Sequence, residues 1–188
     1  MHVITLYSNT IIAEMPGGFL TPREGTYVIG VWNFIASTCS LYSAKRFTRR
    51  FLLIGGHFGM AIAHIMVGIC ILLEWSNLAF AFILIFMFIF CNSSGCITWL
   101  YCSEVAVDVA LGIVGVAGYF TTFWLTLYTV PLMNSGLHQS GTFFLFGVIS
   151  LFTSLWCYFY LKETSGGLTD KQKKSLYVPL DLIEITKL

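Results

Sequence analysis

Charged residues are scarce in this sequence of 188 residues: Asp, Glu, Lys and Arg make up only 10%, while hydrophobic residues make up 57%. Ordinary soluble domains carry about 25% charged residues. A soluble chain of this length buries only about 70% of the surface that its unfolded form exposes, so much apolar surface would stay in water. The net charge of +1 gives no long-range field to attract nucleic acid. The composition predicts a membrane protein and argues against a soluble enzyme, a nucleic-acid-binding protein and a disordered regulator.

The sequence also lacks the patterns of a catalytic or metal site. Its six cysteines fall in apolar segments, and no pair has the spacing of zinc ligands. His57 and His64 share one helical face, but Glu74 beyond them is expected at the far membrane interface. We interpret the histidines and cysteines as packing residues, with Cys91 alternatively lining a cavity. We predict no enzymatic activity, no catalytic residue, no metal and no cofactor.

Long stretches without Asp, Glu, Lys or Arg set the expected topology. A helix needs about 20 apolar residues to span a bilayer, and the uncharged stretches allow five such spans. The expected spans are roughly 26–43, 51–73, 78–102, 109–130 and 142–161. Pro131, Gly136 and Gly141 mark the turn between the last two.

The first segment, about 2–14, is apolar but too short to span a membrane, because about 12 residues rise only about 18 Å as a helix. We interpret it as the end of a sixth helix whose beginning is missing. The predicted fold is an all-α membrane protein. It is a helical bundle over 1–161 with five full spans and a truncated first helix, followed by a cytoplasmic tail over 162–188.

The basic residues predict the orientation of the bundle, because Lys and Arg concentrate on the cytoplasmic side of membrane proteins. Of the 10 Lys and Arg, nine fall on one side of the expected bundle and only Arg23 on the other. The nine are Lys45, Arg46, Arg49, Arg50, Lys162, Lys171, Lys173, Lys174 and Lys187. This distribution predicts an integral multi-pass protein with both ends in the cytoplasm.

Polar residues interrupt two of the expected spans. Asn33 lies in the middle of one, and a cluster around Gly95 lies in another. The cluster comprises Asn92, Ser93, Ser94 and Thr98. Polar groups at that depth are costly and face protein or a water-filled cavity. Two interpretations stay open, a cavity lining and ordinary hydrogen bonding between helices. Stripes of small residues at Gly55, Gly59 and Ala63, and at 112, 115 and 118, predict close helix packing.

Three motifs resemble those of one family. Lys45-Arg-Phe-Thr-Arg-Arg50 resembles the D/E-R-x-G-R-R loop between the eighth and ninth helices of sugar porters. Gly95-Cys-Ile-Thr-Trp-Leu-Tyr-Cys-Ser-Glu104 resembles the tenth-helix pattern G-P-I-P-W-x-x-x-x-E. Lys162-Glu-Thr-Ser-Gly166 resembles the closing P-E-T-K-G. The chain is similar to the C-terminal six-helix half of a sugar transporter of the major facilitator superfamily.

The resemblance implies a set of solute-binding residues. Tyr7 resembles a gate tyrosine of the seventh helix, Asn33 a sugar-contacting asparagine, and Trp99 the tryptophan beneath the sugar. Cys91 stands where the family has a Glu, and Thr121 and Thr122 stand where it has an Asn-Trp pair. Amides and hydroxyls can hydrogen-bond sugar hydroxyls, and an aromatic face can pack on the C–H surface of the ring.

The resemblance also implies a cytoplasmic latch made by Arg49, Arg50, Glu104 and Glu163, whose ion pairs break as two halves of a carrier rock. We therefore expect part of a secondary-active or facilitative carrier that moves a monosaccharide or similar small polar solute by alternating access. Its expected partners are the solute, the lipid bilayer and a missing N-terminal half. The alternative is a non-transporting fragment or a regulatory or assembly subunit of the membrane.

The tail changes character after Gly167. A short helix capped by Thr169 or Asp170 and a solvated, disordered tail are both compatible with its composition. In the first case, Lys171, Lys173 and Lys174 are placed to rest against anionic lipid headgroups.

Overall fold

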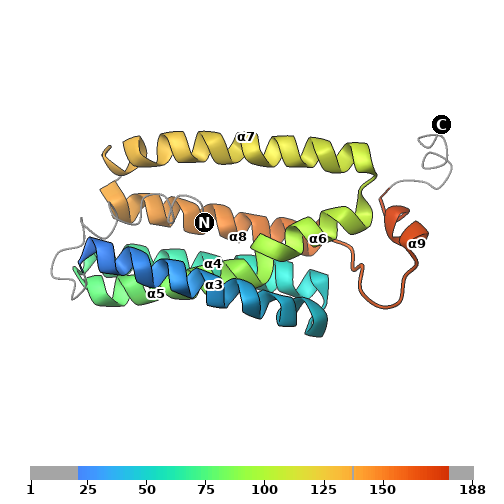
Figure 1. Ribbon diagram of the computed structural model, residues 1–188. Helices are drawn as coiled ribbons and strands as arrows, with labels where there is room; N and C mark the ends of the chain where they lie inside the picture. Colours follow the sequence, from blue (N-terminus) through green and yellow to red (C-terminus); the bar gives the residue numbers. More distant parts are fainter. Residues whose placement is uncertain (1–20, 137, 178–188) are drawn as a thin grey trace.

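The computed structural model describes residues 21–136 and 138–177, and every regular element in these ranges is helical (Figure 1). The elements are α3 (Pro22–Arg46), α4 (Arg49–Leu72), α5 (Ser76–Phe90), the π-helical turn η1 (Cys91–Gly95), α6 (Cys96–Val105), α7 (Asp108–Met133), α8 (His138–Tyr160) and α9 (Asp170–Lys174). The prediction of an all-α fold is confirmed for this part of the chain. The first expected helix, 2–14, lies outside the described residues.

Helix α4 forms the centre of the bundle, with α8 and α5 packed along it (Figure 1). Two hydrogen bonds from side chains to the backbone connect neighbouring helices. The Ser154 hydroxyl of α8 donates to the Ile54 carbonyl of α4 at 3.0 Å. The Trp32 indole of α3 donates to the Leu84 carbonyl of α5 at 2.8 Å. These bonds fix the helix register where apolar contacts alone are not directional.

Four helical stretches of the described residues are long and apolar enough to cross a membrane. They are Arg49–Leu72, Ser76–Val105, Val109–Met133 and His138–Tyr160. Helix α3 has 25 residues, enough for about 38 Å, but its first turn contains Arg23 and Glu24, and it carries Asn33 and several hydroxyl groups. The expected five apolar spans are therefore four apolar spans and one more polar helix.

The helix ends differ from the expected ones by a few residues. Pro22, outside the expected span at 26–43, is the first residue of α3 and follows the N-cap Thr21, a position where the missing N–H of proline has no cost. Pro131, expected in the turn, lies inside the last part of α7. Helix α8 starts at His138 and not at 142. Absence of charge marks the membrane core, whereas local capping decides where a helix ends.

The stretch expected as one span at 78–102 is α5, η1 and α6 in sequence. Within the wider π turn, side chains bond to carbonyls of the preceding turn. The Asn92 amide donates to the Phe88 carbonyl at 2.8 Å, and the Ser93 hydroxyl donates to the Ile89 carbonyl at 2.7 Å. Asn and Ser offer the backbone such alternatives to the regular ladder, so their position in this turn accounts for the break.

The closest helix approach involves a glycine outside the predicted stripes. A Cβ at Gly56 of α4 would overlap the Ser93 side chain of the π turn. A Cβ at Gly55 would meet nothing within 4 Å, and the same holds at Gly112 and Gly118. The stripe at 112–118 is therefore not a close-packing surface, and in α4 the critical residue is Gly56.

These contacts predict opposite effects for neighbouring substitutions. Gly56→Ala forces Ser93 to move and lowers the free energy of unfolding by about 1–3 kcal/mol. Gly55→Ala, the matched control, raises it by up to about 1 kcal/mol because alanine is the better helix former. Thermal unfolding of both variants in detergent, followed by circular dichroism, measures the difference. Equal midpoints would contradict the close approach.

Candidate functional site

An open groove lies between α6 and α7, about halfway along the bundle. Its volume is about 630 Å³, within the usual range for small-molecule sites. The lining combines aromatic rings with hydroxyl groups and, among the described residues, carries no charge. It includes Ser94, Gly95, Thr98, Trp99, Cys102, Tyr119, Thr122 and Thr126. A neutral groove of this composition suits an uncharged polar solute.

Trp99 and Tyr119 form the aromatic part of the groove. Their ring centroids lie 6.3 Å apart across the space between α6 and α7, and Trp99 is 46% exposed. Gly115 of α7 faces the Trp99 ring, and a Cβ there would lie 3.9 Å from it. An exposed indole face of this kind can pack against the C–H surface of a small ring.

The hydroxyl groups supply hydrogen-bonding capacity next to these rings. Thr122 donates its proton to the Gly118 carbonyl of its own helix at 2.9 Å, so its oxygen can accept a hydrogen bond from a solute hydroxyl. Ser94 and Thr98 lie on the opposite wall. The groove can therefore hold a hydroxylated molecule by one stacking face and several acceptors.

The structure divides the predicted solute-binding residues into separate places. Trp99 and Thr122 line the groove. Thr121 does not: its exposed hydroxyl donates to the Ala117 carbonyl. Asn33 and Cys91 lie together elsewhere, between α3 and η1, where the Cys91 thiol is 3.7 Å from the Asn33 side-chain oxygen. Tyr7 lies outside the described residues.

Both interpretations of the polar cluster hold, each for different residues. Asn92 connects helices, since the Ser43 hydroxyl donates to its side-chain oxygen at 2.6 Å. Ser93 is buried against α4. Ser94 and Thr98 line the groove. The π turn thus sends some polar side chains into the protein interior and others into the open space.

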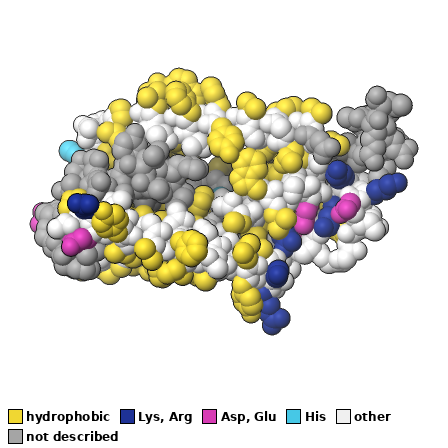
Figure 2. All heavy atoms as spheres, viewed as in Figure 1, with side chains coloured by type: hydrophobic (Ala, Val, Ile, Leu, Met, Phe, Trp, Pro, Cys, Tyr) yellow, Lys and Arg dark blue, Asp and Glu magenta, His cyan; other side chains and the backbone are white. Residues whose placement is uncertain are grey.

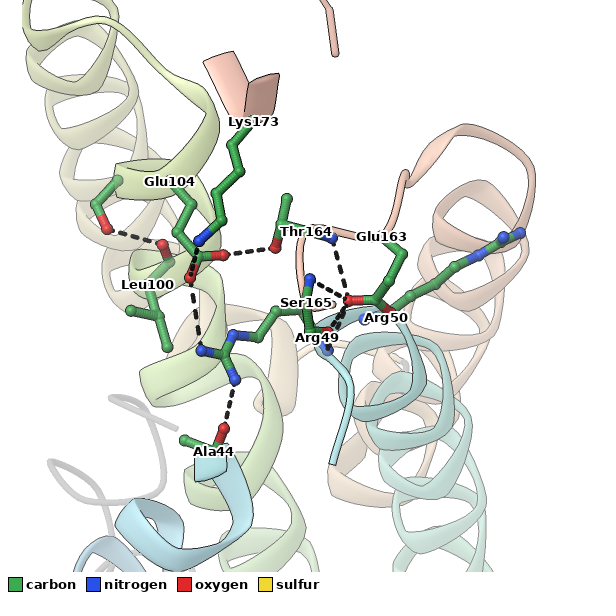
Figure 3. Close-up of polar contacts among 10 residues, drawn as sticks. Ala44, Arg49, Arg50, Leu100, Glu104, Glu163, Thr164, Ser165 and Lys173 are labelled. Carbon is green, nitrogen blue, oxygen red and sulfur yellow. Dashed lines mark hydrogen bonds and ion pairs between the residues drawn. The ribbon is translucent and has the colours of Figure 1, made fainter. Parts of the chain in front are cut away.

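A second polar site, centred on Glu104, lies at the end of the bundle where α9 packs against α6 (Figure 3). One carboxylate oxygen of Glu104 is 3.5 Å from Nη2 of Arg49 and 3.4 Å from Nζ of Lys173. The other accepts a hydrogen bond from the buried Thr164 hydroxyl at 2.5 Å. Arg49 also donates to the Ala44 carbonyl. The side chains of Arg49, Glu104 and Lys173 are only 15–19% exposed, so solvent screens these pairs incompletely.

Glu163 binds the N-terminus of α4 rather than an arginine side chain. Its two carboxylate oxygens accept the backbone N–H groups of Arg49 at 3.2 Å and Arg50 at 3.1 Å. The next N–H, of Phe51, is accepted by the Thr48 hydroxyl. A carboxylate here satisfies helix donors that otherwise lack partners and interacts favourably with the helix dipole. Burial of Glu163 alone would raise its pKa, but the hydrogen bonds from Ser165 and from the Arg50 N–H outweigh burial and lower the pKa.

Arg50, predicted as a member of the ion-pair cluster, pairs with no acidic side chain among the described residues. Its guanidinium donates to the Tyr158 carbonyl at 2.8 Å and lies 5.8 Å from the centre of the Tyr158 ring. The position of Arg50 in the first turn of α4 directs its side chain to α8 and away from Glu104 and Glu163. Arg49 pairs with Glu104 as described above.

The tail contributes contacts that the sequence did not indicate. Thr169 caps the short helix α9, as the sequence allowed. Lys173, which one of the two interpretations placed at lipid headgroups, reaches Glu104. The Tyr177 hydroxyl lies 2.6 Å from that of Tyr101 in α6 and accepts the Lys162 backbone N–H at 2.8 Å. Spacing along the chain could not reveal these pairings, because they depend on how the tail folds back onto α6.

Comparisons with known proteins agree on one class. The family model described as "Sugar (and other) transporter" matches residues 1–175. The chain is 29% identical over 184 residues to Sugar transporter ERD6-like 10 of Arabidopsis thaliana, covering 92% of this chain and 39% of that protein. It is 27% identical over 179 residues to the arabinose-proton symporter of Bacillus subtilis, with 93% and 39% covered.

A solved structure shows the same fold. The crystal structure of a D-xylose-proton symporter superimposes with a TM-score of 0.78 at 20% identity, and the match covers 90% of this chain and 41% of that one. The chain thus spans about two fifths of the length of the proteins it matches.

The Glu104 site predicts a specific effect on the tail. Lys173→Gln removes one of the two cations on Glu104, and the loss of a partly exposed ion pair of about 1 kcal/mol raises the opening of α9 about fivefold. Hydrogen exchange of a peptide covering 169–177 measures this opening. Lys171→Gln is the matched control, since Lys171 lies exposed on the same helix. Equal exchange in the two variants would show that Glu104 does not hold α9.

The lowered pKa of Glu163 predicts a dependence on pH. Because its pKa is lower in the folded chain, the ionised carboxylate contributes stability above its ordinary pKa of 4.5, and this contribution is lost as the pH falls through the lowered value. The wild type should unfold at a higher temperature than Glu163→Gln at pH 7, by a margin that disappears in acid. A margin that stays constant from pH 7 to the acid limit would contradict the assignment.

Proposed function

The chain belongs to the sugar (and other) transporter family, and we propose that it forms one wall of a carrier that moves a monosaccharide or similar small polar solute by alternating access. Its family and its apolar helices make it an integral membrane protein. The proposal depends above all on the uncharged groove between α6 and α7, where the exposed Trp99 ring lies beside several hydroxyl groups.

Within this proposal, Trp99 and Thr122 are the principal solute contacts. Trp99 packs against the C–H face of the sugar, and the Thr122 oxygen accepts from a sugar hydroxyl. Tyr119 closes the groove on the α7 side, opposite Trp99. Ser94 and Thr98 line the side of the groove that η1 and α6 form. Asn33 and Cys91, which bond to each other, have a supporting role in holding α3 against the π turn.

We further propose that transport requires a second six-helix half. Carriers of this type bind their solute near the middle of the membrane, at the interface of two halves. The groove is open along one side of α6 and α7, and the apolar central part of α7 is exposed along its length. Phe120, Phe123 and Leu127 are among the exposed residues of this helix. A second half facing α7 would complete the binding site.

The cluster at Glu104 supports a latch at the cytoplasmic end. Arg49 and Lys173 hold Glu104 from two different elements, while Glu163 holds the N-terminus of α4. Together these contacts keep α4, α6 and the tail in one arrangement. A movement of α6 or of the tail against α4 during rocking would break them, and a partly buried cluster of this kind biases a two-state equilibrium. Arg50 supports the latch only indirectly, through Tyr158.

The charge distribution supports an orientation with both ends in the cytoplasm. Figure 2 shows Lys and Arg side chains gathered at the end of the bundle where α9 lies, and Arg23 belongs to the first turn of α3 at the other end. This asymmetry is the one that the positive-inside rule associates with the cytoplasmic face.

The second candidate is a regulatory or assembly subunit that does not transport. The observation that favours it is the separation of the predicted solute-binding residues, since Asn33, Cys91 and Thr121 do not line the groove that holds Trp99. Such a subunit would bind a complete carrier and change its activity.

Uptake of radiolabelled hexose and pentose into proteoliposomes separates these candidates. We expect no saturable uptake with this chain alone, and saturable uptake when it is reconstituted with the N-terminal six helices of a relative. Trp99→Ala should lower the uptake by about tenfold or more, because aromatic packing and burial are both lost. Trp75→Ala, at an exposed site outside the groove, is the matched control.

Two results would overturn the proposal in different ways. Saturable uptake by the chain alone would refute the need for a second half. Absence of uptake by every pairing, together with co-purification of this chain with a complete carrier, would favour the regulatory subunit.

A further inference from the structure

A second space, which we call the basic pocket, lies at the end of the bundle where α9 packs against α6. It opens to the surface, and its volume is about 490 Å³, within the usual range for small-molecule sites. The connection between α3 and α4, the last turn of α6, the segment 164–168 and α9 all contribute to its wall. The charged residues of the wall are Lys45, Arg46, Arg49, Lys173 and Glu104.

These side chains give the wall an excess of three positive charges. Its carboxylate, on Glu104, already pairs with Arg49 and Lys173 (Figure 3). The ion pairs of the described residues include neither Lys45 nor Arg46. Two adjacent cations without a counter-charge repel each other, so an anion bound between them lowers the electrostatic energy. The free charge of the pocket is therefore that of Lys45 and Arg46.

The segment 164–168 adds uncharged hydrogen-bond donors to the wall. Gly166 and Gly167 both have positive φ, +118° and +82°, a conformation that glycine adopts without steric cost. No hydrogen bond within the described residues uses their N–H groups. Successive backbone N–H groups in turns can form anion-binding concavities. The pocket thus combines two unpaired cations with backbone donors that no other group occupies.

This combination fits a phosphate monoester better than a carboxylate. A phosphate monoester carries about −1.5 to −2 charges near pH 7 and three strong acceptor oxygens, so it can bind both cations and a backbone N–H at once. The guanidinium of Arg46 has a planar fork of donors that matches two phosphate oxygens, and Lys45 supplies a compact point charge. A carboxylate offers only one charge and two oxygens.

We propose that the basic pocket binds an anion that carries a phosphate monoester, held chiefly by Lys45 and Arg46. Such a group belongs to a phosphorylated lipid headgroup or to a soluble organic phosphate. Phe47, which also lines the pocket, stacks on Phe51 with ring centroids 5.9 Å apart, and both rings are exposed. An apolar pair beside the cations suits a ligand that brings an acyl chain. The inference does not rest on the transport function.

One headgroup in soluble and in lipid form tests the site, with the full chain in phosphatidylcholine nanodiscs. Isothermal titration calorimetry measures the binding of inositol 1,4-bisphosphate. Native mass spectrometry compares the retention of phosphatidylinositol 4-phosphate with that of phosphatidylinositol, which lacks the monoester. We expect binding of a monoester and preferential retention of the phosphorylated lipid. The form that binds, soluble or lipid, identifies the source of the ligand.

Two double variants test the location. Lys45→Gln/Arg46→Gln should weaken binding by about tenfold or more, because each basic residue next to an anionic group contributes several-fold. Lys171→Gln/Lys174→Gln is the matched control: it removes the same charge at the same end of the bundle, from residues that do not line the pocket. Screening by salt should limit its effect to about twofold. Circular dichroism melts establish that both variants are folded.

The proposal fails under any of three results. Equal weakening in the two double variants would indicate the general positive field at this end of the bundle and not the pocket. Equal retention of the two lipids, without binding of inositol 1,4-bisphosphate, would show that the monoester is not recognised. Absence of binding of both the soluble and the lipid form to the folded wild type would show that the pocket holds no such anion.

Discussion

The close approach of Gly56 to Ser93 is the contact on which the arrangement of the site depends. It is possible because α4 has no side chain at that point and the chain opposite makes a π-helical turn. The wider turn inserts polar residues where a regular helix would continue an apolar face. As a result, Asn92 reaches α3 while Ser94 and Thr98 face the groove. One packing contact in the apolar interior thereby sets the position of the Trp99 ring one turn further on.

At the end of the bundle where α9 lies, charged groups and not apolar packing set the arrangement of the elements. Glu163 accepts the first N–H groups of α4, and Glu104 connects α6 to α4 and α9. Each carboxylate therefore acts on several elements at once, which makes their effects non-additive. In such a network the loss of Glu104 would leave Arg49 and Lys173 as unpaired, partly buried cations. This is more costly than the loss of either cation alone.

The sequence predicted the class of fold well, because it depends on composition and on charge-free length. The span at 51–73 and the helix at Arg49–Leu72 nearly coincide for this reason. Pairings between distant residues were less predictable. Arg49 with Glu104 was expected from motifs on adjacent loops, but Lys173 and Tyr177 meet α6 only because the tail folds back. Such contacts leave no periodic signal in the chain.

The residues of the groove were likewise only partly predictable from the sequence. Trp99 was identified from its motif, and it lies in the groove. Tyr119 and Ser94 complete the groove, but an aromatic residue on a membrane helix is equally suited to lipid, and a serine to hydrogen bonding between helices. Asn33 was expected at the solute and instead pairs with Cys91. Residue type sets what a side chain can do, whereas the π turn decides which way it faces.

Helix α7 has a mechanical consequence for the width of the groove. Its buried residues, Thr129 and Met133, lie near one end, whereas its central part is exposed. The helix thus resembles a lever fixed near Thr129. Tyr119 is ten residues away, or about 15 Å, so a tilt of about 10° displaces its ring by roughly 3 Å, about the width of one hydroxyl group. The dimension of the groove is therefore adjustable by a rigid rotation that leaves the α4–α8 contact intact.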